Sequence, residues 1–156
     1  MNNILHALYN LVLSLWIGGI SIFTFIITPV IFKSFGRDMA GKIVGKLFPG
    51  YFMYNLALSV IALILFLVIR SAIAHPGHKW SMILIVMAIV INIFVTFKLH
   101  PDVKEVKKEI HSLENLAGDA PVRKKFGKLH AVSASLNLLL LADGVTLLIM
   151  SSVFKK

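Results

Sequence analysis

The chain has 156 residues, of which 58% are hydrophobic, and a formal net charge of +9. This length allows one domain, and since a soluble domain usually stays near half apolar, the composition indicates a protein that lies in lipid. The chain has no cysteine, which excludes disulfides, thiolate metal sites and cysteine nucleophiles. The basic residues lie between apolar runs and form no stripe interleaved with aromatic residues, which argues against nucleic acid as a partner.

Four apolar runs are each long enough for a membrane-spanning helix, which needs about 20 residues. In chain order the predicted spans are about residues 4–32, 50–70, 80–99 and 129–153. Pro29 is expected to kink or end the first span, because proline disrupts a helix interior. Pro49 precedes the second span, Trp80 is expected to anchor the third at the membrane interface, and Pro101 marks the other boundary of the third.

Both longer connections are predicted to contain a short amphipathic helix. Apolar residues recur at helical spacing, with lysines beside them, at about residues 38–48 and again at about 102–116. The first of these helices is expected to lie in the plane of the lipid headgroups. Asp119 and Pro121 are typical of a helix start, so the fourth span is expected to be the end of a longer helix. The predicted fold class is an all-α integral membrane protein, a four-transmembrane-helix bundle with short amphipathic cytoplasmic helices in a single domain, residues 1–156.

The basic residues also predict an orientation. Twelve of the sixteen lysines and arginines lie between the first and second spans or between the third and fourth. Because cytoplasmic connections carry an excess of basic residues, we expect these two connections in the cytoplasm and both termini outside it. The expected location is therefore the cell inner membrane, with the lipid bilayer as the first partner.

Asp143 is the most informative polar residue, because it falls near the middle of the fourth span, in the run LLLLADGVTLL. A carboxylate at that depth costs about 2.5–3.5 kcal/mol on insertion scales. One interpretation is a proton carrier, a cation site or the counter-ion of a ligand. The other is a protonated acid that bonds to a neighbouring span, for instance to Asn92, Asn10 or Tyr9. Asn137 completes this intramembrane polar set.

The histidines suggest two further sites. His6, His75 and His78 are expected on the outer face, where imidazoles suit copper or zinc; the alternative is that they are only solvated. His100 ends the third span and His130 begins the fourth, so antiparallel neighbours bring both to a similar depth. A haem b between two helices needs such a pair of axial ligands. The alternative is a pair of interfacial histidines bonded to backbone or headgroups, and the cofactor stays open between haem b, copper and none.

No sequence motif supports catalysis. The chain has no Walker loop, catalytic triad, HExxH or dinucleotide-binding fingerprint. Gly18 and Gly19, in the middle of the first span, allow close approach between helices. We therefore expect a non-enzymatic protein that assembles with itself or with other membrane proteins.

Over nearly its whole length the chain resembles the transmembrane protein 205-like family, a four-span domain of unknown function. The matching residues are Trp16-x-Gly18, Phe23, Pro29, Phe32, Arg37, Ala40-Gly41, Lys46-Leu47-Phe48-Pro49, Tyr51-Phe52, Leu99-x-Pro101, Phe126, Leu129-His130, Ser133 and Asn137-Leu138. The resemblance implies a four-span bundle with cytoplasmic amphipathic connections. It implies no settled activity, although animal members of that family are associated with platinum-drug resistance.

A more distant similarity concerns the Leu-Trp-x-Gly-Gly pattern that begins at Leu15. Copper-resistance D-type membrane proteins and the haem-associated membrane protoporphyrinogen oxidase are similar there, and they carry a histidine about two turns before the tryptophan. This chain has Tyr9 at that place and His6 one turn further out. His130 and Asn137 remain as family-type positions. The sequence therefore leaves four functions open: assembly with partners, binding of haem or copper, an ion or proton pathway built on Asp143, and a membrane oxidoreductase, which only the distant similarity implies.

Overall fold

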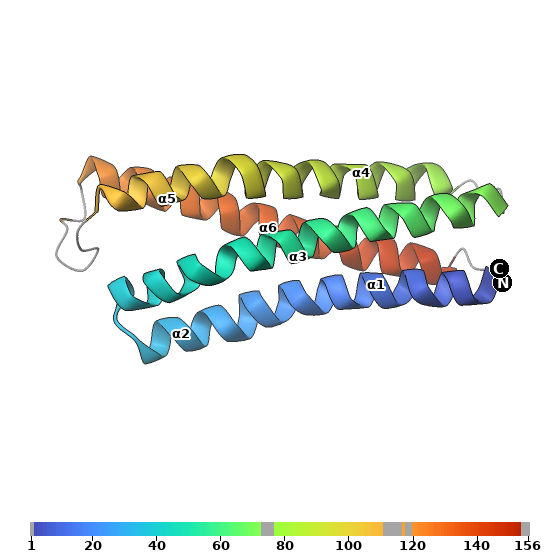
Figure 1. Ribbon diagram of the computed structural model, residues 1–156, viewed down its shortest axis with the longest axis horizontal. Coiled ribbons are helices and arrows are strands. Elements are labelled where there is room, and N and C mark those ends of the chain that lie inside the picture. Colours follow the sequence, from blue (N-terminus) through green and yellow to red (C-terminus); the bar gives the residue numbers. More distant parts are fainter. Residues whose placement is uncertain (1, 73–76, 111–116, 118–119, 154–156) are drawn as a thin grey trace.

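The computed structural model describes residues 2–72, 77–110, 117 and 120–153, and every regular element in these ranges is a helix. Four helical segments are long and apolar enough to cross a membrane, which confirms the predicted four-span all-α architecture. Figure 1 shows them as one elongated bundle with both chain termini at the same end. We call this the terminal end. The opposite end, where the connections after α2 and α5 lie, is called the basic end.

Each span is one helix or a stack of helical segments. The first consists of α1 (Asn2–Ile22), a π-helical turn (Phe23–Ile27) and α2 (Thr28–Ser34). The second is α3 (Arg37–Ala72). The third consists of α4 (His78–Phe94), a second π-helical turn (Val95–Leu99) and α5 (His100–Lys108), and the fourth is α6 (Pro121–Val153).

The four spans run alternately up and down and form a square. α1 packs against α3 and α6, and α4 packs against the same two helices from the other side (Figure 1). Trp16 and Leu13 of α1, Ile85 of α4 and Leu147 of α6 are fully buried where these helices meet. Large apolar side chains are exposed along the outer faces, as lipid-facing helices require.

Both π-helical turns lie just before a proline. The N–H of Thr28 donates to the carbonyl of Phe23, and the N–H of His100 donates to that of Val95. Proline lacks an N–H and its ring collides with the carbonyl four residues earlier, and a wider turn relieves both effects. The expectation that the helix ends at Pro29 was therefore wrong, since it continues to Ser34, and the helix of the third span likewise continues beyond Pro101 to Lys108. A kink at Pro29 and a membrane boundary at Pro101 stay predictions.

The expected helix at 38–48 is not a separate element in the headgroup plane, and this prediction is also corrected. It is the first part of α3, which contains Pro49 and runs without interruption for 36 residues. At 1.5 Å per residue α3 is about 54 Å long, whereas the hydrocarbon layer is about 30 Å thick. The first turns of α3 therefore project beyond the hydrocarbon at the basic end.

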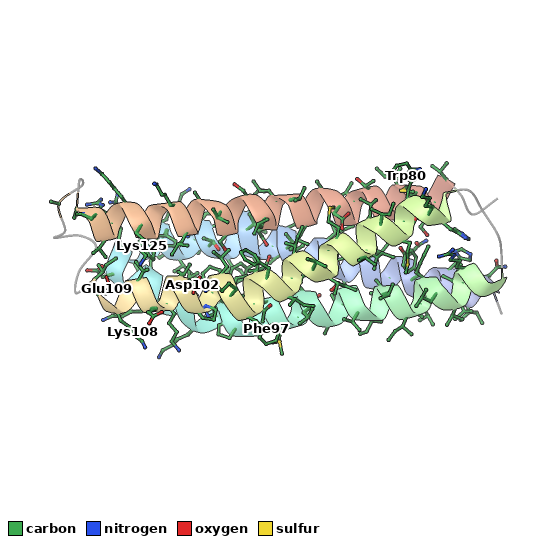
Figure 2. The ribbon with its side chains drawn as sticks, turned by 90° about the horizontal axis from the view of Figure 1, so that it is seen from above. Trp80, Phe97, Asp102, Lys108, Glu109 and Lys125 are labelled. Carbon is green, nitrogen blue, oxygen red and sulfur yellow. The ribbon has the colours of Figure 1, made fainter. Side chains whose placement is uncertain are left out.

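The second connection behaves in the same way. The part of 102–116 that the structure describes belongs to α5, which continues the third span, while residues 111–116 lie outside the described ranges. α6 begins at Pro121, which confirms the predicted long helix; Asp119 is not among the described residues. Figure 2 shows Trp80 at the terminal end and Lys108, Glu109 and Lys125 at the basic end. Trp80 is 62% exposed, in keeping with an interface anchor.

Candidate functional site

Asp143 lies inside the bundle, on the face of α6 that packs against α1. Its side chain is only 4% exposed. The next residue is Gly144, and a methyl group added there would come within 3.0 Å of the Ile17 side chain of α1. The glycine therefore lets the two helices approach closely beside the carboxylate, which ends up surrounded by protein and not by lipid.

Neither carboxylate oxygen of Asp143 has a hydrogen-bond partner in the described part of the chain. The predicted bond to a neighbouring span is therefore wrong for all three candidates. The Asn92 amide is 3.5 Å from the Ser59 hydroxyl, and Asn10 accepts a bond of 2.6 Å from Ser151. Tyr9 lies close enough for its electrostatics to be affected by Asp143, but its hydroxyl forms no hydrogen bond with that carboxylate. A buried polar group without a partner is costly in an apolar medium, and such a group is uncommon without a functional reason.

Asn137 joins three helical segments towards the basic end. It accepts a hydrogen bond from the Tyr51 hydroxyl of α3 and donates one of 2.6 Å to the Thr24 hydroxyl in the first π-helical turn. The Tyr51 ring stacks on Phe23 at a centroid distance of 4.1 Å. Beside this cluster, the Asn55 amide donates to the carbonyl of Tyr51 at 3.0 Å, while its side-chain oxygen is buried and unbonded among the described residues.

Three cavities follow one another from the basic end towards this cluster. The widest, about 540 Å³, lies between α2, α3, α5 and α6. It shares Thr28, Phe48 and His130 with a cavity of about 290 Å³ that reaches Asn137. Asn137 also borders a third cavity of about 10 Å³, lined by Asn55 and Asn92 among others. That volume corresponds to about one water molecule, and three amides can bond a water there.

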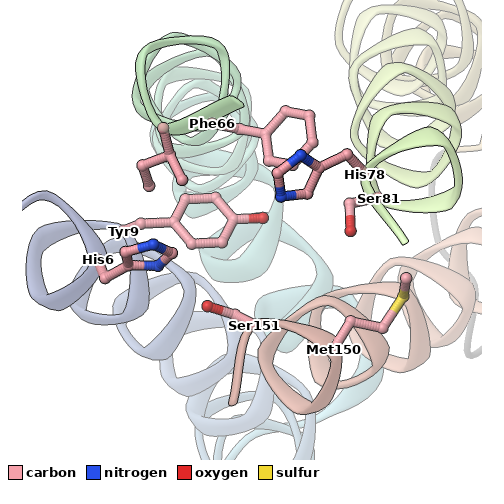
Figure 3. A pocket seen from close by; sticks show the side chains of 8 residues that line it. His6, Tyr9, Phe66, His78, Ser81, Met150 and Ser151 are labelled. Atoms are coloured by element: carbon pink, nitrogen blue, oxygen red, sulfur yellow. The ribbon is translucent and has the colours of Figure 1, made fainter. Parts of the chain in front are cut away.

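A fourth cavity, of about 30 Å³, lies near the terminal end (Figure 3). Tyr9 and His6 of α1, His78 of α4 and Ser151 of α6 line it with other residues. In Figure 3 the Tyr9 ring lies between the imidazoles of His6 and His78. The structure therefore brings two of the three predicted metal-binding histidines to one cavity, and Met150 borders the same space.

This cavity has too few described side chains that could act as metal ligands. In the described ranges no group of three or more histidine, aspartate or glutamate side chains is placed to hold a metal ion, and His75 lies outside those ranges. Nδ1 of His6 is buried without a hydrogen-bond partner in the described part of the chain. The cavity can accept a polar guest of one or two water molecules.

The two haem candidates also reach a common cavity. His100 and His130 both line the 540 Å³ space, His100 with its ring edge-on to Phe52 at 5.5 Å and His130 stacked on Phe126 at 6.2 Å. The prediction that they lie at similar depth is consistent with this shared wall. Lys42, Lys46, Lys104 and Lys107 stand around the same cavity.

Several residues of the site were not predicted. Thr24, Tyr51, Asn55 and Ser59 are polar side chains on apolar spans, and the helical spacing of Tyr51, Asn55 and Ser59 is a signal that places them on one face of α3. The four lysines were expected in the basic connections, near lipid headgroups, and not as the lining of a cavity.

Comparison with known proteins identifies a family, and that family has no assigned activity. A family model described as "Domain of unknown function (DUF4149)" matches residues 11–112. The match covers most of the first three spans, while Asp143, Asn137 and His130 lie beyond it. No curated protein and no solved structure matches the chain.

Proposed function

The chain belongs to the DUF4149 family of domains without an assigned function, and we propose that it is a non-enzymatic component of an ion or proton pathway across the membrane. Asp143 is the central group of this proposal. The single observation that carries it is that the carboxylate is buried in the bundle with no hydrogen-bond partner among the described residues. Such a group can be accommodated as the neutral acid or with a bound cation, which is the property of a relay group.

A series of polar groups supports the path. α6 carries His130, Ser133, Asn137, Asp143 and Ser151 in chain order, and each of them borders a cavity or is buried in the bundle. From His130 to Ser151 the rise along the helix is about 31 Å, close to the roughly 30 Å of the hydrocarbon layer. Polar groups from the exposed His130 to the partly buried Ser151 therefore follow α6 over a length close to that thickness.

Different cavities and polar groups lie on the two sides of Asp143, towards the basic end and towards the terminal end. Towards the basic end lie three cavities that share lining residues, and the two inner ones border Asn137, which is less than two helical turns from Asp143. Towards the terminal end Tyr9, which lies within electrostatic range of Asp143, lines the 30 Å³ cavity. We call the set Thr24, Tyr51, Asn137, Asn55, Asn92, Asp143 and Tyr9 the polar line. In this proposal, side-chain rotation and single water molecules carry the proton between members of the polar line that are not hydrogen-bonded to one another.

Proton flux into proteoliposomes tests this function. With a potassium diffusion potential as driving force and a pH-sensitive dye inside, vesicles with the natural chain should acidify faster than empty vesicles. Asp143→Asn should lose most of this flux and Asp143→Glu should keep part of it. Thr146→Val is the matched control, because Thr146 is exposed on the same helix and, among the described residues, its hydroxyl bonds only the carbonyl of Ala142. Equal flux through the Asp143→Asn and natural chains would overturn the proposal.

The proposal includes assembly, since four spans are few for a transporter that acts alone. We propose a homo-oligomer or a complex with another membrane protein, of the transmembrane protein 205-like type that the sequence resembles. Native mass spectrometry from detergent reports the subunit number, and a strictly monomeric protein with full flux would contradict this part.

The cofactor hypotheses stay predictions. Haem b at His100 and His130 should give a Soret band in the purified protein. Copper or zinc at His6, His75 and His78 should appear in metal analysis of the same sample.

A further inference from the structure

The 540 Å³ cavity differs in character from the polar line. Its walls include the apolar side chains of Val44, Phe48, Val103 and Phe126, while lysines stand around its edge. Lys42 and Lys46 come from α3, and Lys104 and Lys107 come from α5. No aspartate or glutamate is among the residues that line it. The cavity therefore combines an apolar interior with a strong excess of positive charge.

Most of this charge is not used inside the protein. Lys107 donates a hydrogen bond to the carbonyl of Gly41 and so ties α5 to α3. Within the described ranges, no hydrogen bond or ion pair engages the ammonium groups of Lys42, Lys46 and Lys104, and all three side chains are exposed. Three cations that converge on one cavity without internal partners are an anion-binding arrangement.

The depth of the cavity identifies the anion. The lining residues of α3 lie between Gly41 and Pro49, on the turns that project beyond the apolar span. With the predicted apolar span 50–70 in the hydrocarbon layer, these turns are expected at the level of the lipid headgroups. We propose that the cavity binds the headgroup of an anionic phospholipid, with its phosphate at Lys42, Lys46 and Lys104 and the first carbons of its acyl chains against Phe48 and Phe126.

This inference does not rest on Asp143 or on any other member of the polar line, although the proposed path also uses this cavity at the basic end and includes His130, which lines it. Loss of lipid binding leaves Asp143 and its surroundings unchanged. Loss of proton flux in Asp143→Asn leaves the lysines and the cavity unchanged. The two experiments therefore fail separately.

Lipid retention by the purified full chain tests the inference. The protein is delipidated in a neutral detergent, supplied with phosphatidylglycerol or phosphatidylcholine, and examined by native mass spectrometry. Phosphatidylglycerol should bind and phosphatidylcholine should not. Replacing Lys42, Lys46 and Lys104 together by glutamine should weaken binding by about fivefold for each lysine removed.

A matched control separates the cavity from general surface charge. Lys124, Lys125 and Lys128 are exposed at the same end of the bundle, on α6, and do not line the cavity. Replacing these three by glutamine changes the net charge equally and should leave lipid binding intact. If the cavity triple does not fold, judged by thermal melting, Lys104→Gln alone is used and should still show the loss.

Four results would overturn the inference. The first is equal binding of phosphatidylcholine, and the second is equal loss in the control triple. The third is equally strong competition by inorganic phosphate or glycerol phosphate, which would identify a soluble anion as the ligand. The fourth is a Soret band in the untreated protein together with no lipid binding, which would assign the cavity to a porphyrin.

Discussion

Replacing Asp143 by leucine should make the protein more stable, although it removes the central group of the proposed path. Leucine has the same branched shape and the same number of heavy side-chain atoms as aspartate, so the packing against α1 is retained. The carboxylate is 4% exposed and has no hydrogen-bond partner in the described structure, so no bond is lost. Relieving a buried unsatisfied group should raise the free energy of unfolding by about 1–3 kcal/mol.

Asn137→Leu is the control, because it makes the same change of shape on the same helix. Asn137 accepts a bond from Tyr51 and donates one of 2.6 Å to Thr24, and leucine removes both. The Tyr51 hydroxyl, which is partly buried, is then left without its acceptor. The free energy of unfolding should fall by about 1–2 kcal/mol, since hydrogen bonds between membrane helices contribute modestly and an orphaned donor adds to the cost.

One assay measures both predicted changes in the free energy of unfolding, the rise for Asp143→Leu and the fall for Asn137→Leu. The purified chain is unfolded in mixed micelles with a rising fraction of dodecyl sulfate, and helicity is followed by circular dichroism. If Asp143→Leu lowers the free energy of unfolding as Asn137→Leu does, the carboxylate has a stabilising partner and the reasoning behind the path fails. If Asp143→Leu is more stable and conducts no protons, a loss of folding cannot explain the lost flux.

Two further predictions compare the neighbouring glycines Gly18 and Gly19, and cysteine labels at the two ends of the bundle. Gly19→Ala should lower the free energy of unfolding by about 1–3 kcal/mol, because the added methyl would lie 2.5 Å from the Tyr54 ring. Gly18→Ala should leave it unchanged or raise it by up to about 1 kcal/mol, because no atom lies within 4 Å of the added methyl. The mixed-micelle assay measures both, and equal effects would contradict this packing. The chain has no cysteine, so Lys125→Cys introduces a single label at the basic end, and Lys79→Cys introduces one in the first turn of α4, next to Trp80 at the terminal end. In right-side-out vesicles a membrane-impermeant maleimide should label Lys79→Cys alone; the reverse pattern would invert the predicted topology.

The spans were predictable because hydropathy depends only on composition and length. Any run of about 20 apolar residues has to satisfy its backbone internally in lipid, so a helix follows without knowledge of its neighbours. The ends were less predictable. Pro29, Pro49 and Pro101 are each compatible with a helix end and with a continuous helix, and the choice depends on whether packing supports the turns that follow.

The polar line was only partly predictable, for a different reason. Asp143, Asn92, Asn137 and Tyr9 stand out because each is polar within an apolar run. Which of them meet depends on the rotation and vertical register of four helices, and neither quantity is encoded in a single helix. Asn137 therefore bonds to Tyr51 of another span, and Asp143 bonds to none of its expected partners.

The packing around Asp143 also explains why its isolation bears on transport. Gly144 allows α1 and α6 to approach closely beside the carboxylate, and the fully buried Trp16 lies in the same contact. Side chains close the bundle laterally at this level, so lipid does not reach the carboxylate. Exchange with either side then has to follow the bundle axis, through Tyr9 towards one cavity or through the amides near Asn137 towards the others. A carboxylate that is enclosed from the side, with polar groups towards both ends, fits the proposed relay, whereas one that only stabilised the fold would be expected to carry a hydrogen bond to a neighbouring helix.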